Sequence, residues 1–268
     1  MSLSATVGKN LVKKRPAEKT TSGKYASRHG RYRHRDWRKA LEAFRKLMID
    51  KEDTAQVFAI GHALDGDAMK VDYIRLLSMP EGGRIAYERV ELAEKLMDDA
   101  YRASFPPGSV GAAYIQYLER EHFSVAGMID ESHKGIPPEE VDEIHPYAWF
   151  WRRVRDLHDV FHVLTGYGRD ALGEMCLLAF TFQETHGLGL AFVAGGGFLR
   201  ASGPAAMQAR RALLEARRRG KHAAWLPGED YERVLFEPLE EARRRLRLTP
   251  PVQYEKVPVD QRNLVIMG

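Results

Sequence analysis

Residues 147–165 read YAWFWRRVRDLHDVFHVLT, and this stretch decides the fold. Its apolar residues recur at steps of four, three, four and three positions, at Phe150, Val154, Leu157, Phe161 and Leu164. Side chains at these steps lie along one side of an α-helix, so the stretch predicts a helix that packs against a core. Gly166 and Gly168 follow it and permit a sharp reversal, and Asp170 then caps a second predicted helix over 170–186.

The same helical spacing continues outward over most of the chain. Further helices are predicted over 36–48, 57–64, 71–77, 87–101, 110–122, 204–220 and 229–246. A polar loop is predicted over 130–146, a glycine-rich bend at 195–197, and an extended C-terminus from Pro250. Alternating β-branched runs are few, and we find neither repeats nor an internal linker. The sequence therefore predicts one all-α domain over 36–268.

The composition of the 268 residues is that of an ordinary soluble protein, with 44% hydrophobic and 29% charged residues. It excludes disorder throughout, collagen and a coiled coil. No apolar run reaches the roughly 18 residues that a membrane-spanning helix needs. The single cysteine, Cys176, excludes an intrachain disulfide framework and a cysteine-rich zinc module, and it favours a reducing compartment.

Positive charge is concentrated near the N-terminus. Residues 1–38 hold eleven lysines and arginines against two acidic residues, a net charge of +9, which leaves −5 on the rest of a chain whose net charge is +4. Because apolar residues are few, residues 1–35 are predicted to form a flexible basic tail. The tail lacks the apolar core of a secretory signal, and both a solvated tail and an organelle transit peptide stay open. Its aromatic residues are sparse and no nucleic-acid-binding module is present, so no nucleic acid is expected as a partner.

Four metal-ligating side chains gather around the predicted reversal. His158 and His162 are one helical turn apart and leave the same face of the first helix. Asp159 can lean toward the same point, and the reversal brings Glu174 back opposite the histidines. Two imidazoles and two carboxylates that converge suit one divalent metal, with zinc first and ferrous iron second. The alternative is separate residues: a core histidine, an ion pair between Arg155 and Asp159, and a glutamate at a helix start.

The pattern His158-Asp159-x-x-His162, followed after eleven residues by Glu174, resembles the signature of the ubiquinone (coenzyme Q) biosynthesis protein 4 family. All four positions of the signature stand at the family's spacing. Weaker similarity extends over residues 50–250 and leaves the basic tail outside.

The resemblance implies an all-helical protein of ubiquinone synthesis in which His158, Asp159, His162 and Glu174 bind the metal. It implies a polyprenylated aromatic lipid as substrate, with oxidative decarboxylation and hydroxylation at ring C1 of a polyprenylated hydroxybenzoate. A non-catalytic, lipid-binding scaffold is the alternative function. The implied partners are other quinone-biosynthesis enzymes and a membrane surface, to which the protein would attach peripherally. Whether it forms a homodimer stays open. The implied location is the cytoplasmic face of a bacterial inner membrane, or the matrix side of the mitochondrial inner membrane.

Two further predictions concern the substrate. Arg155 is predicted to orient a substrate carboxylate beside the metal, because a guanidinium matches carboxylate geometry bidentately. A long apolar substrate tail is predicted to lie beside the metal, against Leu177, Phe180, Leu188 and Phe192. The same spacing also fits residues of an ordinary hydrophobic core. The arginine-rich stretch 210–221 and the triple glycine at 195–197 depart from the family pattern.

Two other kinds of site compete with the metal site. Residues 166–171 match the dinucleotide fingerprint G-x-G-x-x-A, but that fingerprint requires a preceding strand, and the residues before it are helical in pattern. Asp159 occupies the general-base position of the zincin pattern His-Glu-x-x-His, with a shorter arm than glutamate. Cys176 is predicted to be a small buried apolar group, so nucleophilic catalysis has no candidate.

Overall fold

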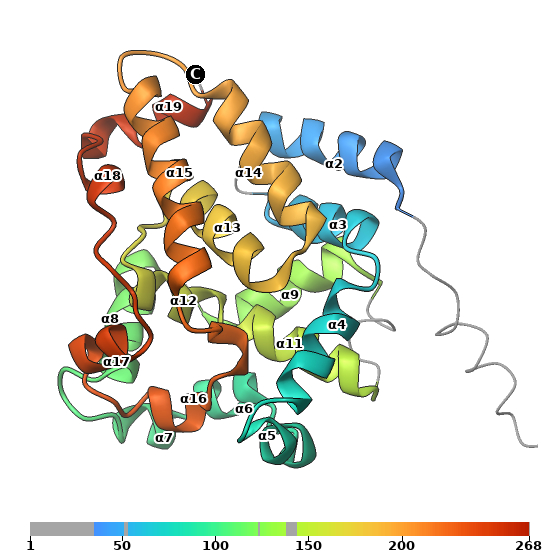
Figure 1. Ribbon diagram of the computed structural model, residues 1–268, viewed down its shortest axis with the longest axis vertical. Coiled ribbons are helices and arrows are strands. Elements are labelled where there is room, and N and C mark those ends of the chain that lie inside the picture. Colours follow the sequence, from blue (N-terminus) through green and yellow to red (C-terminus); the bar gives the residue numbers. More distant parts are fainter. Residues whose placement is uncertain (1–34, 51–52, 123, 138–143, 268) are drawn as a thin grey trace, which may run out of the picture. The chain divides into compact units, whose positions relative to one another are not determined.

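Figure 1 shows the computed structural model, which describes residues 35–50, 53–122, 124–137 and 144–267. The predicted basic tail 1–35 lies outside these ranges except for Arg35. Within them every regular element is a helix, and the strand-like pairing is limited to an isolated bridge between Ser109 and Pro238. The predicted all-α class is confirmed. None of the described helices combines the length and apolarity that crossing a bilayer requires.

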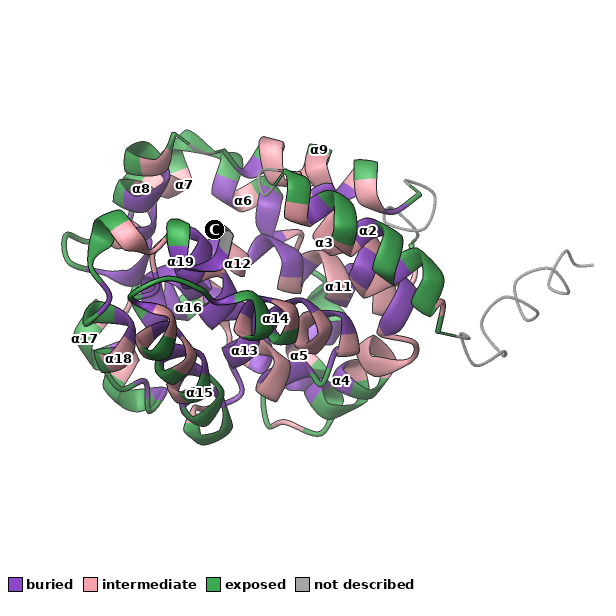
Figure 2. Ribbon diagram, turned by 90° about the horizontal axis from the view of Figure 1, so that it is seen from above, coloured by how far each residue is buried: buried purple, intermediate pink, exposed green. Residues whose placement is uncertain are grey.

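The helices follow one another through short connections. Their bounds are α2 (Trp37–Ile49), α3 (Ala55–Leu64), α4 (Ala68–Leu77), α5 (Gly82–Glu88), α6 (Leu92–Met97), α7 (Asp99–Ala103), α8 (Val110–Glu121), α9 (Val125–Gly135), α11 (Pro146–Asp156), α12 (His158–Thr165), α13 (Ala171–Thr185), α14 (Leu188–Arg200), α15 (Ala206–His222), η1 (Leu226–Gly228), α16 (Tyr231–Val234), α17 (Leu239–Arg245), α18 (Val252–Glu255), η2 (Val259–Gln261) and α19 (Leu264–Met267). Helix α13 lies at the centre, packed against α14, α15, α18 and α19, and most of its side chains are buried. Figure 2 shows exposed residues along the outer sides of α2 and α15.

Side-chain caps explain where several predicted helices begin. The Asp36 carboxylate accepts a hydrogen bond from the Lys39 N–H at the start of α2, and the Ser109 hydroxyl accepts one from Ala112 at the start of α8. Asp170 accepts one from the Gly173 N–H at the start of α13, as the sequence predicted. Each cap satisfies a backbone donor that the first helical turn would otherwise leave without a partner.

The single helix predicted over 147–165 is wrong, because α11 ends at Asp156 and α12 begins at His158. Leu157 between them keeps helical dihedral angles (φ −84°, ψ −7°). The apolar spacing therefore runs on through the break, and a pattern based on spacing alone cannot detect it.

Two other predicted boundaries are corrected. The predicted helix 87–101 is three short helices, because Arg89 is left-handed (φ 45°) and Asp98 is extended and caps α7 through its side chain. The loop predicted over 130–146 is partly helix, because α9 runs to Gly135 after Ser124 caps its first turn. The polar composition of residues 130–135 does not indicate this helix.

The predicted glycine bend at 195–197 is also wrong, because these residues continue α14. A Cβ on Gly196 would stand 2.2 Å from the Phe44 ring, and one on Gly197 would stand 2.9 Å from the Met175 side chain. The two glycines therefore let α14 approach its neighbours closely. The predicted helix 229–246 is α16 and α17, and the predicted extended C-terminus contains α18, η2 and α19.

Two carboxyl groups are buried where α4 packs against α13. Asp72 on α4 and Glu184 on α13 are each 3% exposed, and Glu184 accepts a hydrogen bond of 2.7 Å from the Leu226 N–H. Oxygen Oδ2 of Asp72 has no hydrogen-bond partner in the described part of the chain. Burial raises the pKa of Asp72 to about 7 and the pKa of Glu184 to about 8, against the opposing charge of Arg75.

We therefore expect the protein to lose stability as the pH rises through the window between the ordinary pKa values of these groups, 3.8 and 4.5, and their raised values. In this window the folded chain holds more protons than the unfolded chain, so the free energy of unfolding falls with rising pH. Glu184→Gln keeps an acceptor for the Leu226 N–H and removes one ionisation. Urea unfolding at about pH 5.5 and about pH 8.5 should show a smaller loss in the variant than in the wild type. An equal loss would contradict this role of Glu184.

Candidate metal centre

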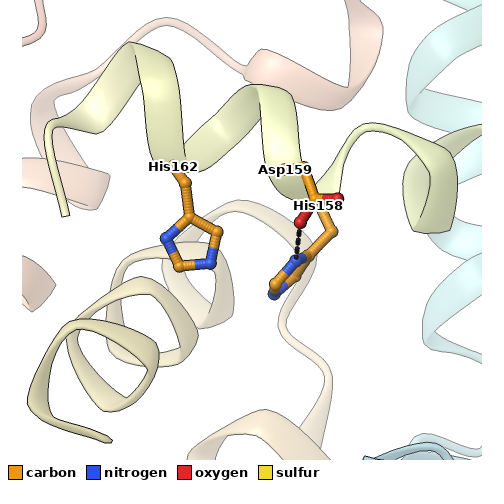
Figure 3. A group of neighbouring side chains, drawn as sticks. All are labelled: His158, Asp159 and His162. Carbon is orange, nitrogen blue, oxygen red and sulfur yellow. Dashed lines mark hydrogen bonds and ion pairs between the residues drawn. The ribbon is translucent and has the colours of Figure 1, made fainter. Parts of the chain in front are cut away.

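Helix α12 presents His158 and His162 one turn apart, and Figure 3 shows both imidazoles on the same side of the helix. Their ring centroids are 4.8 Å apart. His162 is 1% exposed, whereas the side chain of His158 is 31% exposed. One imidazole is therefore held inside the protein and the other borders the solvent.

Glu174 returns to the histidines from the first turn of α13. Its carboxylate oxygens lie 3.3 Å from His162 Nε2 and 3.6 Å from His158 Nε2. The return depends on left-handed Gly166 (φ 79°), which ends α12, and on the Asp170 cap, which begins α13. The predicted reversal thus brings Glu174 opposite both imidazoles.

Asp159 lies on the other side of the His158 ring. Its Oδ1 is 3.3 Å from His158 Nδ1, the nitrogen opposite the one that faces Glu174 (Figure 3). His158, Asp159 and His162 each offer one ligand atom within 4.8 Å of the others. The structure therefore gathers all four predicted residues, with Asp159 in contact with His158.

The hydrogen bonding of His162 is that of a metal-binding imidazole. Its Nδ1 lies 3.1 Å from the Tyr167 carbonyl oxygen. A carbonyl only accepts, so Nδ1 carries a proton and donates it, and in the neutral imidazole Nε2 keeps its lone pair. Nε2 is buried and has no hydrogen-bond partner in the described part of the chain. Metal-ligating histidines characteristically donate their second N–H to such an acceptor.

The spacing and chemistry of the donors fit a divalent ion. Ligand atoms about 2.0–2.1 Å from a zinc ion at tetrahedral angles lie about 3.3–3.4 Å from one another. The separations of Glu174 oxygens from the two Nε2 atoms, 3.3 and 3.6 Å, are close to that distance. Imidazole with carboxylate suits zinc and ferrous iron alike.

The electrostatics of the site keep Glu174 ionised. Burial opposes the charged form, but the neighbouring imidazoles of His162 and His158 outweigh it, so the pKa of Glu174 is lowered. Burial alone would lower the pKa of His158. Its hydrogen bond with Asp159 and the charge of Glu174 outweigh burial, so the pKa of His158 is raised. An ionised Glu174 carboxylate that faces two imidazole nitrogens is suited to binding a cation.

Distant segments support the site in ways that sequence spacing missed. Tyr117 of α8 stacks on His162 with ring centroids 5.6 Å apart and planes 17° apart. The Tyr254 hydroxyl donates to Asp170 and accepts from the Gly168 N–H. No motif signals these contacts, because their partners lie dozens of residues away in the sequence.

Arg219 also supports the loop between α12 and α13. Its guanidinium, buried on α15, donates to the Thr165 and Thr249 carbonyls and lies over the Tyr167 ring at 4.7 Å. The loop that places the Tyr167 carbonyl beside His162 is therefore fixed from the opposite side. The sequence of this arginine-rich helix did not indicate that one of its arginines is buried.

Arg155 has other partners than the one expected for it. Its Nε donates to Asp156 Oδ1 at 2.8 Å, and a terminal nitrogen donates to Ser132 Oγ at 2.9 Å. The guanidinium also lies over the Trp151 ring at 5.5 Å. The alternative ion pair with Asp159 is thus replaced by one with Asp156, the next residue along the chain.

The residues predicted to contact an apolar tail divide into two groups. Leu177 and Phe180 are buried in the core, whereas Leu188 and Phe192 are partly exposed. Phe192 contacts the Phe44 ring, with centroids 5.2 Å apart. These contacts are those of ordinary core packing.

The competing sites find little support. The dinucleotide fingerprint at 166–171 follows helix α12, and the described part of the chain contains no strand before it. Cys176 is fully buried, and burial raises the pKa of its thiol far above the ordinary value. A buried neutral thiol is a poor nucleophile.

Comparison with known proteins gives one consistent family. A family model for coenzyme Q (ubiquinone) biosynthesis protein Coq4 matches residues 37–252. The mitochondrial ubiquinone biosynthesis protein COQ4 of Paracoccidioides brasiliensis is 34% identical over 110 residues, which are 41% of this chain and 36% of that protein. Its mitochondrial counterpart in Neurospora crassa is 33% identical over 110 residues, 41% of this chain and 29% of that protein. The matched segment thus spans about a third of the length of these curated relatives.

A solved structure shares the fold. The crystal structure of a protein from Nostoc punctiforme, assigned by its name to ubiquinone biosynthesis, superposes with a TM-score of 0.59. The superposition covers 80% of this chain and 99% of that chain, at 19% sequence identity. At this identity the likeness shows that the two chains share an architecture.

Proposed function

The chain belongs to the coenzyme Q (ubiquinone) biosynthesis protein Coq4 family, and from this premise we propose that it is a metal-dependent enzyme of ubiquinone synthesis. The proposed reaction is oxidative decarboxylation with hydroxylation at ring C1 of a polyprenylated hydroxybenzoate. The observation that carries the proposal is the buried Nε2 of His162, which lies 3.3 Å from a Glu174 carboxylate oxygen and has no hydrogen-bond partner among the described residues. A nitrogen in that condition calls for a cation between it and the carboxylate.

The residues that would hold the ion are His158, Asp159, His162 and Glu174. When bound, a divalent ion supplies Lewis acidity, and ferrous iron would also supply one-electron redox chemistry. The reaction replaces the ring carboxyl by a hydroxyl and releases carbon dioxide, so it needs an oxygen donor. With dioxygen as that donor, two electrons and two protons from a reductant give one water.

The chain's own side chains have defined tasks in this proposal. The Tyr167 carbonyl holds the proton on Nδ1 of His162, which directs Nε2 toward Glu174. Tyr117 covers the imidazole and excludes water from it. The partly exposed ring of His158 marks the side from which a substrate ring approaches. For Arg155 we propose that it orients the substrate carboxylate, in exchange for part of its contact with Asp156.

Turnover by the purified, metal-loaded chain tests this function. A prenylated hydroxybenzoate in detergent, with dioxygen and a reductant, should yield carbon dioxide and the ring-hydroxylated product, and Glu174→Gln should abolish the yield. Arg155→Lys keeps the charge and loses the fork, so it should weaken binding of a carboxylated analogue without affecting a decarboxylated one. Equal affinity for both would leave Arg155 a structural role.

A lipid-binding scaffold is the competing outcome of the same experiment. Four protein ligands would leave a tetrahedral ion without an exchangeable position, and such a closed centre would be structural. In that case the metal-loaded chain would bind the prenylated ring with no turnover under any supply of dioxygen and reductant. Peripheral attachment to a membrane and contact with other quinone-biosynthesis enzymes belong to both versions of the proposal.

A further inference from the structure

Helix α15 carries an exposed face that the proposed metal site does not use. The helix has 17 residues, and the arginine-rich stretch belongs to it. Its side toward α13 is buried, at Ala209, Ala212, Leu213, Ala216 and Gly220. Its outer side is exposed, at Met207, Arg211, Leu214, Arg217, Arg218 and Lys221. At 100° per residue these six positions fall within an arc of about 120°, which we call the basic face of α15.

The cations of the basic face have no partner in the described part of the chain. The four cations make no hydrogen bond or ion pair with described residues; they are Arg211, Arg217, Arg218 and Lys221. Two other arginines of the same helix are used internally, since Arg210 donates to the Phe198 and Ala201 carbonyls and Arg219 holds Thr165. The one acidic residue of α15, Glu215, lies off this arc and accepts a hydrogen bond from the Gln253 N–H.

Several other exposed arginines are paired. Arg84 contacts Glu81 and Glu88, and Arg245 contacts Glu229 and Glu237. The basic face of α15 instead gathers four exposed cations that lack such pairs among the described residues. Four like charges within one arc repel one another, and an anionic surface relieves that repulsion.

Apolar side chains interrupt the row of cations. Met207 is 61% exposed and Leu214 is 44% exposed, and both lie near the middle of the basic face. Leu199, at the end of α14, is 79% exposed, and Arg210 of α15 donates to the carbonyls of Phe198 and Ala201 on either side of that end. Helices that lie in the plane of a membrane surface combine cations with exposed apolar residues in this manner.

We propose that the basic face of α15 docks on an anionic lipid bilayer. Its four cations meet the headgroup phosphates, and Met207 and Leu214 enter the boundary between headgroups and acyl chains. A nucleic acid would satisfy the charge and leave both apolar side chains in water, so the bilayer is the better complement. The choice of a membrane rests on the proposed function in one respect, because a polyprenyl substrate resides in a bilayer.

Vesicle co-sedimentation of the full chain tests the proposal. The vesicles are phosphatidylcholine alone or with about 30% phosphatidylglycerol, at about 50 mM and about 150 mM salt. Wild type should bind the anionic vesicles, and less at the higher salt. Each cation near an anionic leaflet contributes about 1 kcal/mol, so R211Q/R218Q should lower the partition coefficient about 30-fold. Leu214→Ser should lower it with all charges kept.

A matched control removes the same charge elsewhere. R102Q/R233Q, on α7 and α16, lowers the net charge as much as R211Q/R218Q does, but it should bind as wild type does because both residues lie outside the basic face. Equal losses in the two double variants, equal binding of R211Q/R218Q and wild type, or absence of wild-type binding to anionic vesicles would overturn the proposal. Metal content and turnover in detergent, measured on the same samples, report on the proposed function separately.

Discussion

His162→Ala is expected to release the metal from the protein. The variant removes a buried nitrogen that lies 3.3 Å from the Glu174 carboxylate, and with it the hydrogen bond to the Tyr167 carbonyl. No neighbouring side chain of the cluster replaces that nitrogen, since His158 already faces the other Glu174 oxygen. Loss of a ligand should weaken binding by more than the 10–100-fold typical of a lost supporting hydrogen bond.

Elemental analysis of the purified variant measures this effect. Wild type should hold about one equivalent of metal and the variant less than about a tenth of that amount. His222→Ala is the matched control, because this histidine is exposed at the end of α15, and it should keep the full equivalent. A His162→Ala variant that binds one equivalent as tightly as wild type would show that His162 is not a ligand.

Gly173→Ala is expected to be the most destabilising of the single-methyl additions near the site. A Cβ at this position would stand 2.0 Å from the Gly168 carbonyl oxygen and 2.7 Å from its carbon. Both are backbone atoms of the loop between α12 and α13, which have no free rotation to escape the clash. The loop must separate from α13, which moves the Tyr167 carbonyl and Glu174 relative to His162. We expect a loss of about 3 kcal/mol in the free energy of unfolding, together with loss of metal.

Gly195→Ala provides the opposite expectation in the same protein. This residue is exposed within α14, and a Cβ there meets nothing within 4 Å. Alanine should therefore stabilise the helix by about 0.5–1 kcal/mol. Urea unfolding and metal analysis of both variants decide the matter. Wild-type stability and full metal content in Gly173→Ala would contradict the tight contact between α13 and the loop.

The local arrangement of the site was largely predictable, and its supports were not. The one-turn spacing of His158 and His162 and the glycines before Asp170 are short-range features, so the sequence alone predicted that Glu174 would face the histidines. Tyr117 and Arg219 reach the site from α8 and α15. Such contacts depend on how helices pack, and one sequence contains no signal for them.

Helix existence was easier to predict than helix continuity. Leu157 keeps the apolar phase across a break, and the three glycines at 195–197 pack inside a helix because neighbouring side chains occupy the space of their missing Cβ atoms. Spacing along a helix also does not settle the partners of Arg155. Helical spacing placed it beside His158, and in the structure its guanidinium contacts Asp156 and Ser132.

Anomalous diffraction from crystals of the purified protein tests the central claim most directly. Data collected on both sides of the zinc and iron absorption edges locate the ion and identify it. We predict a single strong peak about 2.0–2.2 Å from donor atoms of His158, Asp159, His162 and Glu174. A map with no peak among these atoms, or with its metal peak bound by other residues, would contradict the account.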